Sequence, residues 1–397
     1  MTFCEEVVLN VLALDRAFQD YAFLHVYLGP AAWLKRAARI PPARAYERLR
    51  DLAARLDEAG IPDEPPRFRK TYLADLLRCV LTQAEVFAFK RRRPFARTVE
   101  SLMAAELPRP FRLEPELAEI KRLLRKQGFA SASDYRRSKK RIRLRTRQEL
   151  LDFVLAALAD VSGRLARRCG DAFGFDLSEL VTGSRLKVVT PGRGDPPCFY
   201  RYDGRGRGTL GIALKTEFSE TYLKGFISHE AVPGHHLYYL VKQRRIDQGR
   251  TDPIDFIDTF YSPENVINEG LAVCADRLYG QVLDDSSHLS AQLEKFMHRV
   301  IYNAWHRVNI QGLDTGRAAD RILRGELGLS EEVVARELRY HTRQARHYTP
   351  VYPLGIRYVE ELAAGLPLAQ VPRLYEQHSV ATLRKLHRSL CPSPQAA

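Results

Sequence analysis

Three of the eleven histidines lie within eight residues of one another, and a glutamate directly follows the first of them. Residues 229–236 read His-Glu-Ala-Val-Pro-Gly-His-His. In zinc hydrolases with a His-Glu-x-x-His motif, the two histidines share one helix face and bind the metal. The glutamate between them takes a proton from the water that the metal activates. This stretch therefore predicts a catalytic metal site with His229 as a ligand and Glu230 as the general base.

A proline occupies the position where the second histidine of that motif would stand. Pro233, four residues after His229, has no N–H to donate to the His229 carbonyl, and its ring clashes there. Gly234 follows and can adopt unusual backbone dihedral angles. We therefore expect the helix to break or bulge here, which would bring a later histidine to the metal.

The sequence leaves the choice of that histidine open. In an unbroken helix His236 returns to within about 20° of His229, whereas His235 lies about 120° away. If Pro233 and Gly234 are a two-residue insertion into the motif, His235 is the ligand instead, and the proline favours this second interpretation. The other histidine would face the substrate or support the metal through a hydrogen bond.

A third ligand is expected from a helix that begins at Ser262-Pro263-Glu264, where serine caps the helix and proline takes its first position. Asn265, Glu269 and Asp276 follow at spacings of four and seven and form one polar stripe on an otherwise apolar helix. A buried carboxylate is costly unless it is paired or binds a metal. Two histidines and Glu269 would leave one coordination position open for water, as a catalytic zinc requires.

Helical periodicity dominates the remaining sequence. We predict a mainly α fold: one large helical domain with a small β-sheet or ribbon beside the metal-site cleft. The chain divides into an N-terminal helical region, residues 1–185, and a metal-site region, residues 186–397, which we expect to form one continuous unit. Helices are expected over residues 70–90, 117–124, 148–165 and 289–310, with three more between 330 and 390, and strands over 186–190, 199–202 and 209–214.

The composition is that of an ordinary globular protein, since 45% of the 397 residues are hydrophobic and 28% are charged. The sequence contains no run of about 18 uncharged apolar residues, so it predicts no membrane-spanning helix. Charged residues interrupt the apolar start, residues 1–20, so it does not resemble a secretory signal. The six cysteines have no paired spacing and are expected to be reduced, which favours a cytoplasmic location. The oligomeric state stays open.

The formal net charge of +14 suggests a polyanionic partner. The densest basic run spans residues 136–147, and a smaller one covers residues 90–93. A nucleic-acid site would use such cations, but the run carries few side chains that could stack on bases and no groove-reading motif. We therefore favour a solvated surface, and we keep a non-catalytic polyanion-binding protein as an alternative function.

Two segments resemble the paired signatures of a bacterial family known as domain of unknown function 885. Residues 229–237, His-Glu-Ala-Val-Pro-Gly-His-His-Leu, match its HEAxPGHHLQ motif, and residues 269–276, Glu-Gly-Leu-Ala-Val-Cys-Ala-Asp, are similar to its EGWALYAE motif. Tyr352-Pro353-Leu354-Gly355 resembles its YxxG segment. The family in turn resembles helical gluzincin-type metallopeptidases such as the thermostable carboxypeptidases. The resemblance covers residue 186 to the end.

The resemblance implies a divalent metal, with zinc first, bound by His229, His235 and Glu269. Glu230 would act as general base and then as proton donor to the leaving group. Tyr352 and His236 could donate hydrogen bonds to the tetrahedral oxyanion. The expected activity is hydrolysis of an amide bond in a peptide-like or small amide substrate, with carboxypeptidase-like character.

Two further expectations concern substrate binding. The strand over residues 209–214 could pair with an extended substrate as an edge strand, and Arg339 or Arg346 could hold a terminal carboxylate. A rival enzyme class uses the same ligands, since two histidines and one carboxylate also bind iron in non-haem oxygenases. Such enzymes need no base beside the first histidine, so Glu230 favours the hydrolase.

Overall fold

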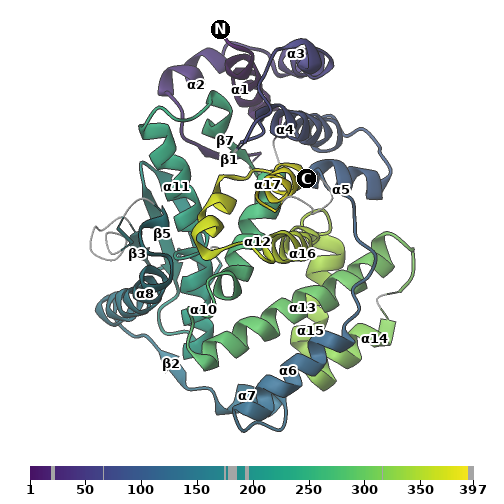
Figure 1. Cartoon of the computed structure of the whole chain (residues 1–397). Helices are drawn as coiled ribbons and strands as arrows, with labels where there is room; N and C mark the ends of the chain where they lie inside the picture. Colours follow the sequence, from purple (N-terminus) through teal and green to yellow (C-terminus); the bar gives the residue numbers. More distant parts are fainter. Residues whose placement is uncertain are drawn as a thin grey trace.

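The computed structural model describes residues 1–18, 23–65, 67–173, 176–177, 186–192, 196–314 and 316–391, and most of them are helical. The expectation of a mainly α fold with small sheets is thereby confirmed (Figure 1). The largest hydrophobic cluster draws residues from both regions of the chain, for example Leu158 and Leu354. The boundary placed after residue 185 falls next to residues outside this description.

Two helices at the centre of the molecule, α12 (Pro263–Leu278) and α16 (Val351–Ala363), pack backbone against backbone (Figure 1). A Cβ on Gly270 would lie 2.4 Å from the carbonyl oxygen of Gly355, and a Cβ on Gly355 would lie 2.2 Å from that of Val266. Only glycine allows this approach, because any side chain would overlap the neighbouring helix. As expected, α12 starts after Ser262, whose hydroxyl accepts a hydrogen bond from the Asn265 amide at 3.2 Å.

A three-stranded sheet flanks this centre, with β5 (Arg207–Ile212) between β3 (Leu186–Val189) and β4 (Cys198–Gly204). β3 is parallel to β5 and β4 is antiparallel to it. The three strands occur where the sequence predicts them. The edge role expected for residues 209–214 is wrong, because both sides of β5 already pair with neighbouring strands and leave no free edge for a substrate.

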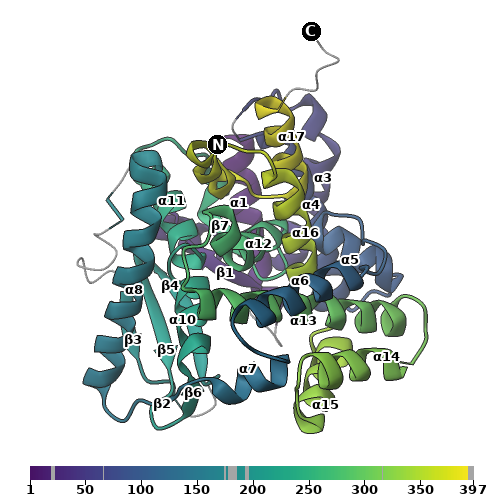
Figure 2. The same ribbon diagram turned by 60° about the horizontal axis from the view of Figure 1, so that its bottom comes forward.

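Two helices cover this sheet. α8 (Arg147–Cys169) packs against β3, and α11 (His235–Asp247) packs against β4 (Figure 2). The stripe predicted for α8 is buried, with Val154, Leu158 and Val161 at most 4% exposed. α11 therefore connects the sheet to the centre of the molecule, since its N-terminus reaches toward α12.

The N-terminal helices form one end of the molecule around a second hydrophobic cluster (Figure 1). A two-stranded antiparallel ribbon, β1 with β7, connects this end to the segment before α12. Because that segment leads directly into α12, the N-terminal end braces the start of the central helix. The elements at this end are α1 (Phe3–Leu14), β1 (Leu24–Tyr27), α2 (Ala31–Ala37), α3 (Pro42–Ala54), α4 (Arg69–Gln83), α5 (Phe95–Met103) and β7 (Ile257–Thr259).

The opposite end is built on the long helix α13 (Asp285–Asn309), which packs against α12 and α16. A third hydrophobic cluster joins α13 to the helices around it. A short ribbon, β2 with β6, leads into α10. The other elements at this end are α6 (Glu114–Lys126), α7 (Ala132–Ser138), β2 (Arg141–Arg143), β6 (Glu217–Ser219), α10 (Glu220–Glu230), α14 (Gly316–Arg321) and α15 (Glu331–Arg339). The C-terminal helix α17 (Val380–Leu390) instead packs against α4 and α16.

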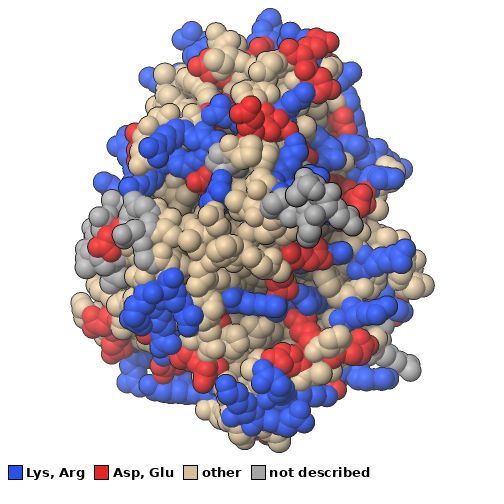
Figure 3. Space-filling view, viewed as in Figure 1, with Lys and Arg blue, Asp and Glu red and all other residues tan. Residues whose placement is uncertain are grey.

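The surface charge is dispersed on the face shown in Figure 3, where basic side chains occur across the whole face with acidic ones between them. Acidic residues also compensate part of the basic run over residues 136–147, since Lys140 pairs with Glu220 at 3.0 Å and Arg143 with Glu217 at 3.9 Å. Among the helices that the structure describes, none has the length and apolar character needed to cross a membrane.

Candidate metal centre

The helix that carries His229 ends where the sequence predicts a break. α10 stops at Glu230 and α11 starts at His235, with Gly234 at the turn between them. The Gly234 amide donates to the Ser228 carbonyl at 3.1 Å, and a Cβ on Gly234 would lie 1.6 Å from the His229 carbonyl oxygen. Glycine is therefore required here, and the tight turn folds the start of α11 back over the end of α10.

This turn brings His235 next to His229, and α12 adds Glu269. The Glu269 Oε2 atom lies 3.3 Å from His229 Nε2 and 3.5 Å from His235 Nε2, and the ligand atoms of the three side chains all lie within 4.8 Å of one another. A tetrahedral zinc ion with bonds of about 2.0–2.2 Å places its ligand atoms about 3.3–3.5 Å apart. The two distances from Glu269 Oε2 to the imidazole nitrogens are therefore compatible with a shared metal ion.

The carboxylate itself gives a second reason to expect a cation. Glu269 is 7% exposed, and its Oε2 atom faces the two imidazole nitrogens without a well-aligned hydrogen bond among the described residues. A buried carboxylate is costly unless it is paired, so this oxygen requires either protonated imidazoles or a metal ion beside it. Two imidazole nitrogens and one carboxylate are a common donor set of catalytic zinc and leave a coordination position open. The residues present thus fit the metal that the sequence predicts.

Two neighbours hold these ligands in place, and the sequence interpretation missed both roles. The Asn268 Oδ1 atom lies 2.9 Å from His235 Nδ1, which places the proton on Nδ1 and leaves Nε2 free for a metal. The Tyr348 hydroxyl donates to Glu269 Oε1 at 2.9 Å. Asn268 could have been found as the residue directly before Glu269, whereas Tyr348 is 79 residues away from it in the chain.

The three groups also perturb one another's titration. Burial alone would lower the pKa of His229 and His235, but the adjacent carboxylates outweigh burial and raise both, that of His235 to about 9. Burial would raise the pKa of Glu269, yet the two histidines hold it far below its usual range. Burial raises the pKa of Glu230, which suits a general base that works near neutral pH.

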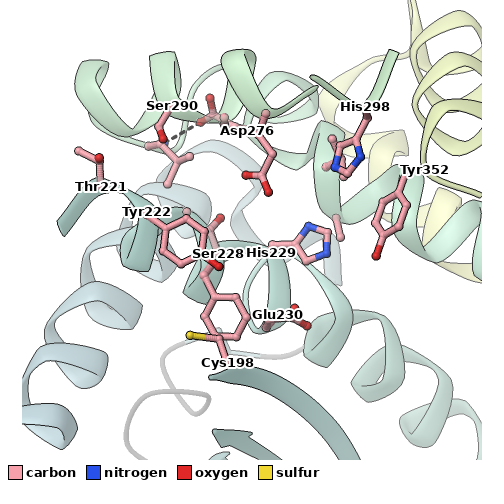
Figure 4. A pocket seen from close by; sticks show the side chains of 17 residues that line it. Cys198, Thr221, Tyr222, Ser228, His229, Glu230, Asp276, Ser290, His298 and Tyr352 are labelled. Carbon is pink, nitrogen blue, oxygen red and sulfur yellow. Dashed lines mark hydrogen bonds between the residues drawn. The ribbon is translucent and has the colours of Figure 1, made fainter. Parts of the chain in front are cut away.

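A cavity of about 230 Å³ opens beside this group and is lined by His229, Glu230 and Tyr352 (Figure 4). The Glu230 Oε2 atom lies 3.9 Å from His235 Nε2. Burial raises the pKa of Tyr352 well above its usual value, so its hydroxyl keeps its proton and can donate. Glu230 and Tyr352 therefore share the cavity with one predicted metal ligand.

His298 also lines this cavity. Its ring stacks on Tyr352 with centroids 4.6 Å apart and planes 5° from parallel, and the two lie side by side in Figure 4. Burial lowers the pKa of His298 to about 3, so the ring is neutral. No sequence spacing connects His298 to Tyr352, so only the packing of α13 against α16 reveals their contact.

His236 lies outside the group of ligand atoms and outside the lining of this cavity. It is 1% exposed, and its Nδ1 atom is 2.9 Å from the Tyr200 hydroxyl on β4. Because α11 begins at His235, the next residue points about 100° further round the helix, toward the sheet. The structure therefore groups His235, and not His236, with His229 and Glu269, and it gives His236 no access to an oxyanion in this cavity.

The two arginines suggested for a terminal carboxylate also lie away from the cavity. Arg339 and Arg346 are exposed and line neither this cavity nor the larger one beside it. The Arg346 guanidinium instead lies 5.1 Å from the centre of the Phe95 ring. Neither arginine therefore holds a terminal carboxylate in this cavity, because α15 and the segment before α16 direct both side chains outward.

No family model matches the chain, and no curated protein matches it. Among solved structures, the chain is similar to a protein of Colwellia psychrerythraea that is provisionally described as a lipoprotein, with a TM-score of 0.52 and 16% identity over 90% of this chain. A protein of Shewanella oneidensis, provisionally described as a lipoprotein of unknown function, gives a TM-score of 0.41 and 14% identity over 89% of this chain. The chain spans 61% and 66% of the lengths of these two proteins. The first similarity concerns the fold alone.

Proposed function

We propose that this protein is a metal-dependent hydrolase of amide or peptide bonds that uses zinc and has carboxypeptidase-like character. One observation carries the proposal: the ligand atoms of His229, His235 and Glu269 lie within 4.8 Å of one another, and Glu230 lies beside them in a cavity. The motifs shared with the domain of unknown function 885 family support the same conclusion. An iron oxygenase would use the three ligands but leave Glu230 without a purpose.

The chemistry divides among the side chains in a simple way. Zinc bound at this position would polarise the amide carbonyl and make a water molecule more acidic. Glu230 takes the proton of the attacking water, whose oxygen forms the new bond to the carbonyl carbon. The same carboxyl group then gives the proton to the departing nitrogen as the C–N bond breaks, and the products are a carboxylate and an amine.

Tyr352 has the position and protonation state to assist this step. Its hydroxyl faces the cavity and stays protonated, so it can donate to the oxygen that becomes negative while water adds. The neutral His298 ring stacks on the Tyr352 ring and restricts its orientation. Held donors of this kind stabilise the transition state because they need no rearrangement during the reaction.

The test compares three variants after removal of metal and reconstitution with zinc. Glu230→Gln should retain about one zinc per chain and lose about 10²–10⁴-fold in the rate of peptide cleavage. His229→Ala should lose the metal as well, and Glu332→Gln, at an exposed position, should change neither. Unchanged turnover in Glu230→Gln would overturn the mechanism. Bound iron with oxygen consumption and no cleavage would overturn the hydrolase.

We also propose a cytoplasmic location, which the six free cysteines support. Cell fractionation with an antibody against the chain tests it. Recovery in the envelope fraction would overturn the proposal.

A further inference from the structure

A second cavity, of about 480 Å³, adjoins the one beside the predicted metal ligands. The two cavities share four lining residues, Thr221, Tyr222, Ser290 and Glu294. The volume is in the range of small-ligand sites. Because the walls are continuous, a substrate whose cleaved bond lies next to Glu230 would extend into this second cavity.

One wall of the second cavity carries three cations, Arg136 and Lys139 at the end of α7 and Arg141 at the start of β2. Neutral groups hold the first two in place. The Arg136 Nε atom donates to the Leu327 carbonyl at 2.9 Å. The Lys139 ammonium lies 3.4 Å from the centre of the Tyr135 ring and donates to the Ser286 hydroxyl. Among the described residues, none of the three cations forms an ion pair within 4.0 Å, and only the more distant carboxylates of Glu294 and Asp284 attract Arg136 and Lys139.

The acidic residues of this cavity leave the wall positive. Glu217 pairs with Arg143 at 3.9 Å, and Glu337 pairs with Arg336 at 3.0 Å. Glu294 is the exception, and it stands at the junction of the two cavities rather than on the basic wall. A concave surface with one sign of excess charge concentrates ligands of the opposite sign.

Burial adds to the demand for an anion at this wall. The surrounding protein strips water from Arg136 and Lys139, which lowers the pKa of both. Partly buried charges without a counter-charge are unfavourable, and an anion between them would relieve that cost. Lys140 and Arg143 of the same basic run already have carboxylate partners. The three cations of the wall thus differ from these two neighbours in sequence.

We propose that Arg136, Lys139 and Arg141 bind carboxylates of the substrate, so that the amide cleaved beside Glu230 belongs to an acidic peptide. This inference rests on the proposed hydrolase function. Glu294 limits where the acidic side chain of the peptide can bind, since its negative charge disfavours a second carboxylate at the junction of the two cavities. The acidic side chain is therefore expected beyond the junction and not directly next to the cleaved bond.

The test uses matched peptides with glutamate, glutamine or lysine at the distant position, and a further set with glutamate next to the cleaved bond. With the zinc-loaded protein at low salt, kcat/KM for the distant glutamate should exceed that for glutamine by about tenfold. The difference should shrink as salt rises, because ions screen the attraction. Glutamate next to the cleaved bond should give no such gain.

The variant that tests the wall replaces Arg136, Lys139 and Arg141 with glutamine. It should lose the preference for glutamate, measured as the ratio of kcat/KM for the glutamate peptide to kcat/KM for the glutamine peptide. Its control replaces Lys35, Arg44 and Arg125, which are exposed and line neither cavity. Each triple variant removes three positive charges from +14 and leaves +11, so a general effect of net charge would appear in both. Arg141→Gln alone should shift the preference in the same direction if the triple variant proves unstable.

Binding separates this inference from the hydrolase proposal. The labelled glutamate and glutamine peptides are titrated into zinc-loaded Glu230→Gln protein, with and without the wall substitutions, and followed by fluorescence anisotropy. Preferential binding of the glutamate peptide without any turnover by the unchanged protein would sustain the anion site and overturn the hydrolase. Turnover with equal rates for both peptides would sustain the hydrolase and overturn the anion site. The anion site would also be overturned if the glutamate peptide showed no preferential binding, or if the preference survived the wall substitutions.

Discussion

Gly270 on α12 and Gly355 on α16 touch through their backbones, so closely that a Cβ on either one would overlap the other helix. Glu269 directly precedes Gly270, and Tyr352 lies one turn before Gly355. The contact therefore determines how near the predicted metal ligand on α12 comes to the hydroxyl donor on α16. The two glycines therefore help to position the candidate metal centre.

Gly270→Ala should force α12 and α16 apart. We expect a loss of about 1–3 kcal/mol in the free energy of unfolding, because the added methyl group meets backbone and not a flexible side chain. Zinc affinity should fall in the same variant. Urea denaturation and zinc titration measure the two effects. Gly163→Ala on α8 is the control, since its Cβ would lie 3.6 Å from the nearest atom and should leave stability unchanged or raise it by about 1 kcal/mol. Equal stability of the two variants would contradict the explanation.

Tyr348→Phe should weaken metal binding without touching the metal. Its hydroxyl donates to Glu269 Oε1, and loss of a hydrogen bond that orients a metal ligand costs about 10–100-fold in affinity. Competition with a chromogenic chelator measures the zinc Kd. Tyr340→Phe, at an exposed tyrosine, should keep the original Kd. If Tyr348→Phe also keeps it, Glu269 needs no support from this hydroxyl.

Tyr352→Phe should give the opposite pattern, with zinc affinity retained and catalysis reduced. Removal of a donor to the developing oxyanion lowers kcat by about 10²–10³-fold and leaves KM nearly unchanged, because the interaction strengthens only in the transition state. Steady-state kinetics on the zinc-loaded variant test this. A rise in KM at constant kcat would instead make Tyr352 a residue that only binds substrate.

Metal binding should release protons and strengthen as pH rises. The pKa of His235, about 9, means that a proton occupies this imidazole in the metal-free protein at pH 7, and the neighbouring carboxylates raise the pKa of His229 as well. Zinc binds neutral imidazole and must displace them, so its apparent affinity should rise up to about pH 9 and then level off. Calorimetric titrations in buffers of different ionisation enthalpy count the protons. Binding without proton release at pH 7 would contradict the prediction.

The same titration has a consequence for the stability of the metal-free protein. The pKa of His235 is about 9 in the folded chain and 6.5 ordinarily, so protonation stabilises the fold. This contribution is fully present below pH 6.5 and is lost as pH rises through about 9. Urea midpoints of the metal-free protein should therefore fall over this interval, and Glu269→Gln should reduce the fall because it removes a carboxylate that raises the pKa of His235.

Lys242→Met should destabilise the fold strongly. Lys242 on α11 and Glu264 on α12 are 4% and 0% exposed, and the ammonium lies 2.6 Å from the carboxylate. Removal of the lysine leaves the buried Glu264 without its cationic partner and with only the Tyr72 hydroxyl and the His378 ring beside it, which costs about 3–5 kcal/mol. Lys70→Met breaks the exposed pair with Asp57 and should cost less than about 1 kcal/mol. Urea denaturation compares the two variants. Similar losses in the free energy of unfolding would show that burial does not increase the contribution of the ion pair.

The sequence by itself determined the local features of this protein. The break after Glu230 follows from Pro233, which lacks an N–H, and the start of α12 follows from the cap formed by Ser262. The stripe of Val154, Leu158 and Val161 predicted the buried face of α8. Each of these features depends on groups a few residues apart, so the energies that decide them are already present in a short segment.

Only the tertiary structure decided what meets across long separations in the chain. It placed His235 rather than His236 beside Glu269, because α11 starts again in a direction that α12 and the sheet determine. It brought Tyr348 to Glu269 and stacked His298 on Tyr352, and it gave β5 two neighbours instead of a free edge. It also placed Arg136, Lys139 and Arg141 on a cavity wall that Glu294 of α13 shares. No local energy term distinguishes these residues, since their roles depend on the packing of helices that are distant in sequence.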